Sequence, residues 1–308
     1  ITIALSLVSY YLLENPIRFG RFSKRKLTPL VLYALLLSVG GLGFATFKSN
    51  GYPQRFIQHE QTQASETSSA TKGKVVLVGD SNGQMFEGAL RNLYGKAGYN
   101  LVGHSQGGCL PLLNLDRHDP GAAPAGCATS INQWLEEGLN NPDVQEVLVI
   151  GRFHMIGNVY DITKLGEDAV AQGGIHSEAN KWAIVERQLE ATVKMFEGKG
   201  KKLTFFHVIP HLDFDPGQCE SRPVRILSRK KEDCTISRNA VLQEQRQYRA
   251  IFDRIKTRYG FVAFFDPVAV LCDQASCKAE MDGVLLYKDD GHLNEAGAEF
   301  VLKSYKPR

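Results

Sequence analysis

Apolar and polar positions alternate in blocks along most of the chain. Short apolar runs have the composition of buried β-strands, and they lie at residues 74–79, 99–105, 144–151, 202–210 and 261–267. Longer stretches with the apolar period of amphipathic helices separate several of them, at residues 82–98, 181–200 and 240–260. This alternation predicts an α/β domain in which helices cover both faces of a parallel sheet, giving three layers.

Two longer apolar runs precede this domain. The run at residues 27–47 carries no charge and is long enough to cross a bilayer as a helix, with a buried core helix as the alternative. The run at residues 1–13 resembles the end of another membrane helix, and because the chain opens without Met, we expect it to begin inside a larger protein. The expected parts are the end of a membrane helix (residues 1–13), a basic loop (14–26), a transmembrane helix (27–47), a linker (48–73) and a folded domain (74–308).

Basic residues gather between the two apolar runs and set the expected orientation. They are Arg18, Arg21, Lys24, Arg25 and Lys26. The positive-inside rule places this loop in the cytoplasm and the folded domain on the far side of the membrane. The whole chain has a formal net charge of only +3, and its densest basic patch borders a membrane segment, so we expect no nucleic-acid partner.

All six cysteines follow the second apolar run, and an even number is typical of an oxidising compartment. Their spacing suggests three local disulfides, although other pairings are possible: Cys109 with Cys127, Cys219 with Cys234, and Cys272 with Cys277. A zinc site is the alternative. Because the chain has no short CxxC pair and no histidine cluster beside these cysteines, we expect no metal.

Ser81 lies in the sequence VGDSNG, directly after the first predicted strand. In parallel α/β sheets ligands bind beyond the carboxyl ends of the strands, and a helix N-terminus presents unpaired N–H groups to developing negative charge. A serine at this position is suited to attack a carbonyl. Serine is also a preferred helix cap, so the local pattern supports a nucleophile and a cap equally.

A nucleophilic serine needs a general base, and His292 has the most suitable surroundings. Asp289 precedes it by three residues in a loop that leads to a C-terminal helix. The carboxylate can fold back onto one imidazole nitrogen and leave the other for a partner. The alternative is a histidine that merely begins a helix; other histidines, such as His118 and His207, resemble surface or core residues.

Together, Gly79, Asp80 and Ser81 near the start of the domain and Asp289 and His292 near its end resemble the SGNH hydrolase family. This resemblance implies a flavodoxin-like three-layer fold and a Ser81–His292–Asp289 triad. The sequence SYYLLENPIR at residues 9–18 further resembles the end of the membrane domain of acyltransferase-3 proteins. Members fused to an SGNH domain have one more membrane helix and a linker before it, which is the arrangement expected here.

The oxyanion hole is less clear. Ser81 is expected to contribute its N–H, and the block around residues 104–113 offers Gly107, with Gly108 as the alternative. Where the family usually has an Asn donor, this chain has Phe153. Three substitutes are open: Arg152, Asn158 from the next loop, or backbone groups alone. Arg152 could equally be an ion-pair partner under the loop.

The resemblance implies an O-acetyltransferase anchored in the inner membrane, with its SGNH domain in the periplasm. Ser81 would receive an acetyl group from an acyltransferase-3 domain of the same polypeptide and pass it to a hydroxyl of a surface glycan such as O-antigen. Acetyl-CoA would be the donor, bound by residues outside this chain, which itself is expected to bind no cofactor. The alternatives are a carbohydrate acetylesterase, a non-catalytic glycan-binding module, and a structural partner in an assembly.

Overall fold

The structure is a computed structural model that describes residues 2–19, 28–48, 72–118, 126–156, 161–164, 178–219 and 233–308. The chain forms two compact units, Ile1–Ser68 and Ser69–Arg308.

The first unit contains helix α1 (Thr2–Ser9), a π-helical turn (Tyr10–Glu14), α2 (Asn15–Arg18) and α3 (Thr28–Lys48). Helix α3 covers the apolar run that the sequence predicts to span a membrane. Among the described residues, no helix was found with the length and apolar character that crossing a membrane requires. The two membrane segments therefore stay predictions. Nearly all of the predicted linker and most of the basic loop lie outside the described residues.

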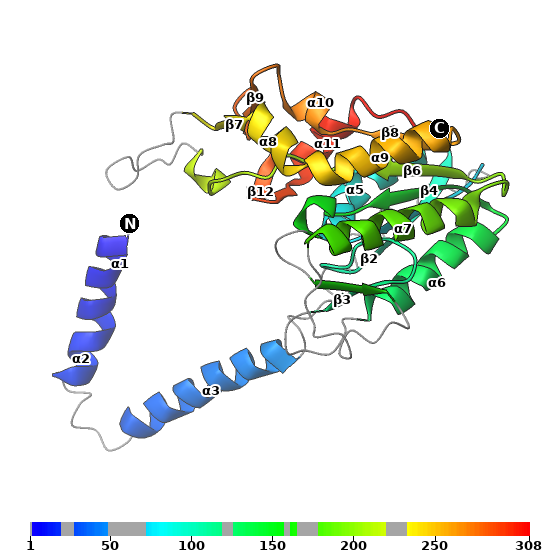
Figure 1. The fold of residues 1–308 in the computed structure, drawn as a ribbon. Helices are drawn as coiled ribbons and strands as arrows, with labels where there is room; N and C mark the ends of the chain where they lie inside the picture. The colour runs from blue at the N-terminus through cyan, green and yellow to red at the C-terminus, as the bar shows by residue number, and fades with distance from the viewer. Residues whose placement is uncertain are drawn as a thin grey trace. The chain divides into compact units, whose positions relative to one another are not determined.

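Five parallel strands form the central sheet of the second unit, in the order β2-β1-β4-β6-β8 (Figure 1). They are β1 (Gly73–Gly79), β2 (Tyr99–Ser105), β4 (Val144–Ile150), β6 (Lys202–Phe206) and β8 (Val262–Phe265). This is the flavodoxin-like order, in which the sheet reverses its direction of growth at β1. Such a reversal leaves a crevice at the carboxyl ends of β1 and β4, where ligands bind in folds of this class.

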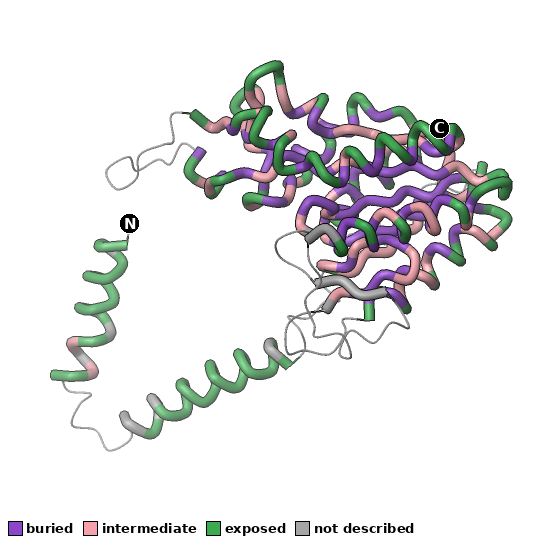
Figure 2. Tube along the Cα trace, in the orientation of Figure 1, coloured by how far each residue is buried: buried purple, intermediate pink, exposed green. Residues whose placement is uncertain are grey.

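Successive residues of β1 face opposite layers because side chains alternate along a strand. Val76 and Val78 pack with α6 (Cys127–Asn140), α7 (Glu178–Phe196) and α9 (Arg246–Arg258). Val75 and Leu77 pack with α5 (Ser81–Lys96) and α11 (Glu295–Leu302). Figure 2 shows the sheet strands largely buried, with exposed residues along the outer sides of the helices. The predicted three-layer α/β class with a parallel sheet is confirmed.

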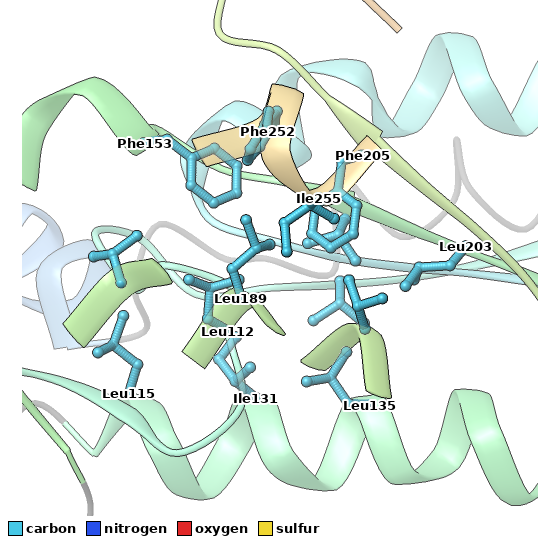
Figure 3. Packing of buried hydrophobic residues seen from close by; sticks show 14 of the residues in the cluster. Leu112, Leu115, Ile131, Leu135, Phe153, Leu189, Leu203, Phe205, Phe252 and Ile255 are labelled. Carbon is cyan, nitrogen blue, oxygen red and sulfur yellow. The ribbon is translucent and has the colours of Figure 1, made fainter. Parts of the chain in front are cut away.

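One of the two hydrophobic clusters is shown in Figure 3. Phe153 and Phe252 lie edge to face, with ring centroids 5.0 Å apart, and Ile131 and Leu135 approach from α6. Both clusters are made of residues of the second unit. That unit therefore carries its own core, which is the property of a domain that folds independently.

Several short elements surround the sheet. Two-stranded antiparallel pairs form between β3 (Leu115–His118) and β5 (Asp161–Lys164), β7 (Thr235–Ser237) and β9 (Ser276–Lys278), β10 (Glu280–Met281) and β11 (Val284–Leu285), and β12 (Tyr287–Asp289) and β13 (His292–Leu293). Short helical turns lie at Phe153–Ile156, Pro216–Gln218 and α10 (Val268–Leu271). The loop expected to hold Asp289 and His292 is thus the hairpin β12–β13.

The helix predicted over residues 240–260 is two helices, α8 (Arg238–Glu244) and α9. They meet at Gln245, which is buried and donates to the carbonyl oxygens of Val208 and Ile209 at 3.2 Å. The apolar period is continuous across this point, so the pattern gave no sign of the break.

The three disulfides pair as predicted, Cys109 with Cys127, Cys219 with Cys234, and Cys272 with Cys277. All six cysteines are used, so no thiolate is left to bind zinc, and the zinc alternative is wrong. The first bridge fixes the segment that directly follows Gly107 and Gly108 to the start of α6.

Replacing Cys109 and Cys127 together with serine is expected to lower the free energy of unfolding by about 3 kcal/mol, because the bridge joins residues 18 positions apart and restricts the unfolded chain. Urea denaturation of the purified protein measures this loss. The matched control replaces Cys272 and Cys277, which are 5 positions apart, and should lose only about 2 kcal/mol. A larger loss from the shorter loop would contradict this explanation.

Candidate active site

Ser81 lies at the sheet reversal, where β1 turns into α5. The turn is tight: a Cβ on Gly79 would lie 2.7 Å from the carbonyl oxygen of Ile150 and 2.8 Å from the Cα of Gly83. Only glycine at position 79 permits this approach of β1, β4 and the first turn of α5. Ser81 is thereby held at the carboxyl edge of the sheet.

Ser81 is not the helix cap. Asp80 is the N-cap, and its side chain accepts a hydrogen bond from the N–H of Asn82 at 2.7 Å, while Ser81 is the first helical residue. The cap interpretation of Ser81 is therefore wrong, because the neighbouring aspartate performs that role. The Ser81 hydroxyl remains available for another partner.

The hairpin β12–β13 brings His292 to that hydroxyl. His292 Nε2 lies 2.8 Å from Ser81 Oγ, and His292 Nδ1 lies 2.8 Å from Asp289 Oδ1. Asp289 also accepts the N–H of Gly291 at 2.9 Å. The structure thus brings together the three residues that the sequence singles out, in one chain of hydrogen bonds.

Asp289 is held in its ionised form. Burial alone would raise the pKa of its carboxyl, but hydrogen bonds from the Gly291 N–H and from His292 outweigh it and bring the pKa below the usual value. An ionised carboxylate at Nδ1 orients the imidazole, so that Nε2 faces Ser81 as a proton acceptor.

Ser81 and Gly107, the expected backbone donors of an oxyanion hole, lie after neighbouring strands, β1 and β2. Gly107 lies in the turn after β2, and the preceding Gln106 donates its N–H to the carbonyl of Gly79 at 3.0 Å, which ties this turn to the end of β1. Gly107 is exposed, and a Cβ there would meet nothing within 4 Å. Gly108 has a φ of +73° and lies against the guanidinium of Arg117.

Phe153 does not substitute for the missing asparagine. Its ring is fully buried and packs against Phe252 and Tyr248, facing the core. Asn158, a candidate substitute from the next loop, lies outside the described residues.

Arg152 does lie beside the hairpin. Its backbone N–H donates to Asp80 Oδ2 at 2.7 Å, and its guanidinium packs against Gly291, the neighbour of His292. Among the described residues its guanidinium forms no ion pair with a carboxylate within 4 Å, although its charge acts on the carboxyl groups of Asp80 and Glu244. Its Nε is buried with no partner in the described structure.

Asp80 joins the two sides of the site. It is buried, and burial raises its pKa to about 6, although the N–H groups of Arg152 and Asn82 and the charge of Arg152 oppose this shift. One carboxylate therefore fixes both the start of α5 and the segment after β4.

Replacing Gly291 with alanine should displace the Arg152 guanidinium, because the new Cβ would lie 2.7 Å from Arg152 Nη2. If Arg152 stabilises an oxyanion, kcat for an acetyl ester should fall on the order of tenfold to a hundredfold, with little change in stability, since the end of a flexible side chain can move. Gly88→Ala is the control, because a Cβ there meets nothing within 4 Å. An unchanged kcat would show that the Arg152 guanidinium does not stabilise the oxyanion.

Sequence reasoning missed a second group of polar side chains near this hairpin, His154, His211, Glu244 and Asp290. The only available signal was that His154 and His211 each follow a predicted strand, where ligands bind in this fold class.

The sequence matches the family model described as "SGNH domain (fused to AT3 domains)" over residues 50–307. The chain belongs to this family. Among solved structures, this SGNH domain is similar to the periplasmic domain of a lipopolysaccharide acetyltransferase from Salmonella serovar Paratyphi A, at 14% identity and a TM-score of 0.48, covering 76% of this chain and 82% of that one. It is also similar to a GDSL-like lipase from Bacteroides thetaiotaomicron, at 12% identity and a TM-score of 0.36, covering 80% of this chain and 91% of the other. No curated protein matches the sequence significantly.

Proposed function

We propose that this SGNH domain transfers an acetyl group through Ser81 to a hydroxyl of a cell-surface glycan. The observation that carries the proposal is the unbroken chain of hydrogen bonds from Ser81 Oγ through His292 to Asp289. A serine paired with a base, which is itself oriented by a carboxylate, is the arrangement of nucleophilic acyl transfer.

In the first step, Ser81 Oγ attacks the carbonyl carbon of the acetyl donor, and its proton passes to His292 Nε2. The N–H groups of Ser81 and Gly107, with the Arg152 guanidinium nearby, stabilise the resulting oxyanion. His292 then gives its proton to the leaving group, the bond to the donor breaks, and acetyl-Ser81 remains.

In the second step, a sugar hydroxyl attacks the acetyl carbonyl and gives its proton to His292. The bond to Ser81 Oγ breaks, and His292 returns the proton to that oxygen. Asp289 stays ionised throughout and stabilises the imidazolium. Water in place of the sugar would give hydrolysis by the same machinery.

The donor side of the proposal rests on the family, whose SGNH domains are fused to acyltransferase-3 domains. We propose that such a domain of the same polypeptide supplies the acetyl group, ultimately from acetyl-CoA, across the inner membrane. The three disulfides support an oxidising compartment such as the periplasm for this domain.

The test incubates the purified protein with 4-nitrophenyl acetate as donor and an O-antigen oligosaccharide as acceptor, and analyses the products by mass spectrometry. Acetylated oligosaccharide that disappears in His292→Ala supports the proposal. Acetate alone would identify an acetylesterase instead. Oligosaccharide binding without release of 4-nitrophenol would identify a binding module and overturn the triad.

A further inference from the structure

Two carboxylates from separate segments lie near one imidazole, that of His211, beside the candidate site. His211 follows β6, Glu244 ends α8, and Asp290 lies in the turn of hairpin β12–β13. His211 Nε2 lies 3.5 Å from Asp290 Oδ2, and His211 Nδ1 lies 3.9 Å from Glu244 Oε1.

This group adjoins the Ser81–His292 pair through the backbone. Asp290 follows Asp289 directly and is two residues from His292. The N–H of Leu212 donates to the carbonyl oxygen of Asp290 at 2.8 Å, so the His211 segment is fixed to the turn of the hairpin. A ligand bound by these side chains would therefore be held next to the base.

These side chains can reach water and still have unused hydrogen-bonding capacity. The side chains of His211, Glu244 and Asp290 are 28%, 40% and 60% exposed. At 3.5 and 3.9 Å the carboxylate oxygens and the imidazole nitrogens are too far apart for good hydrogen bonds. Each carboxylate therefore retains acceptor sites that a ligand hydroxyl can fill.

A buried histidine lies beneath them. His154 is only 8% exposed, its Nε2 lies 3.7 Å from Glu244 Oε1, and neither of its ring nitrogens has a hydrogen-bond partner in the described structure. Buried polar atoms are rarely left unpaired, so an unpartnered imidazole beside an open carboxylate indicates a bound water or ligand group.

We propose that His211, Glu244 and Asp290 bind the acceptor, a sugar whose neighbouring hydroxyl groups they position beside His292. This inference rests on the proposed function. Carboxylates accept hydrogen bonds from hydroxyl groups, and the imidazole adds a donor or an acceptor. A phosphate or carboxylate placed against Glu244 or Asp290 would be repelled, so the groups that contact these two side chains are expected to be uncharged hydroxyls.

The test measures binding of an uncharged O-antigen oligosaccharide to the purified protein by isothermal titration calorimetry, without donor. Glu244→Gln and His211→Ala should each raise Kd on the order of tenfold, the effect of losing a hydrogen bond to a charged group. Glu136→Gln, an exposed residue of α6, is the control and should leave Kd unchanged. Unchanged Kd in both variants, or no binding by the unmodified protein, would overturn the inference.

A second readout separates this inference from the proposed function. In the same variants, the fold-decrease in the rate of 4-nitrophenyl acetate hydrolysis should be roughly ten times smaller than the fold-decrease in acceptor affinity. If the hydrolysis rate and the acceptor affinity fall by the same factor, these residues act on the acetyl transfer step, and their proposed role in acceptor binding is overturned. If the unmodified protein binds the oligosaccharide but never forms acetyl-Ser81, the proposed function fails, and the Kd values still decide the acceptor site.

Discussion

Replacing Ser81 with alanine is expected to lower turnover of 4-nitrophenyl acetate by at least about a thousandfold, as the loss of the nucleophile does in other triads. The reason is geometric: the Ser81 hydroxyl is the group that lies 2.8 Å from His292 Nε2. The measurement is release of 4-nitrophenol under saturating ester.

The control for this substitution is Ser237→Ala. Ser237 is an exposed serine at the start of α8 whose side chain makes no capping bond, so its loss should leave turnover unchanged. Because Asp80 rather than Ser81 caps α5, Ser81→Ala should keep the free energy of unfolding within about 0.5 kcal/mol. Turnover that persists in Ser81→Ala would refute the nucleophile assignment.

His292 gives an independent check on the same result. Residues that act as one catalytic unit have strongly non-additive effects, so His292→Ala added to Ser81→Ala should reduce turnover little further. If the turnover of the double variant falls by the product of the two single losses, Ser81 and His292 act separately, which would contradict the role inferred from their hydrogen bond.

Acid is expected to destabilise the domain through His154, by up to about 5 kcal/mol between pH 6.5 and 3. Burial, and after it the charges of Arg152 and His211, lower the pKa of His154 to about 3 from an ordinary value of 6.5. The folded protein therefore keeps this imidazole neutral, whereas the unfolded chain takes up a proton below pH 6.5. The stability it contributes is complete above pH 6.5 and is lost as the pH falls toward 3.

Urea denaturation at pH 7 and pH 4.5 measures this effect, comparing the unmodified protein with His154→Gln. The variant lacks the titrating group, so on acidification it should lose about 3 kcal/mol less than the unmodified protein. Acidification changes the contribution of Asp80 to stability in the opposite direction. Its pKa is raised to about 6 in the folded protein, so the folded state takes up this proton at a higher pH than the unfolded chain does. That contribution is present in both proteins and cancels in the comparison. Equal losses would show that His154 is not held neutral by the fold.

The sequence predicted the central sheet because each of its strands is a short apolar run bounded by polar residues or glycine. Residues 99–105 were predicted to the residue, and β1 and β4 to within one. Helix α6 was missed because it directly follows a stretch rich in Gly and Pro, although its buried residues, such as Ile131 and Leu135, recur at helical spacing. The short antiparallel strand pairs were not predicted, because strands of two to four residues have no detectable apolar period.

The candidate site was predictable to the extent that it consists of recognisable residue types at fixed spacing. Ser81, Asp289 and His292 are such residues, and the structure places them together. The capping role of Asp80 depends on its φ and ψ angles, and the position of Arg152 depends on the absence of a Cβ at Gly291. The group around His211 depends on the meeting of two loops and the end of α8, and no local pattern carries that information.

The hydrogen bond between Ser81 and His292 joins positions 211 residues apart. Because synthesis proceeds along the chain, Ser81 leaves the ribosome well before His292. A chain that ends between these two positions therefore contains the serine without the histidine. Under the proposed mechanism such a chain has no catalytic activity, which begins only when β12 and β13 have joined the rest of the fold.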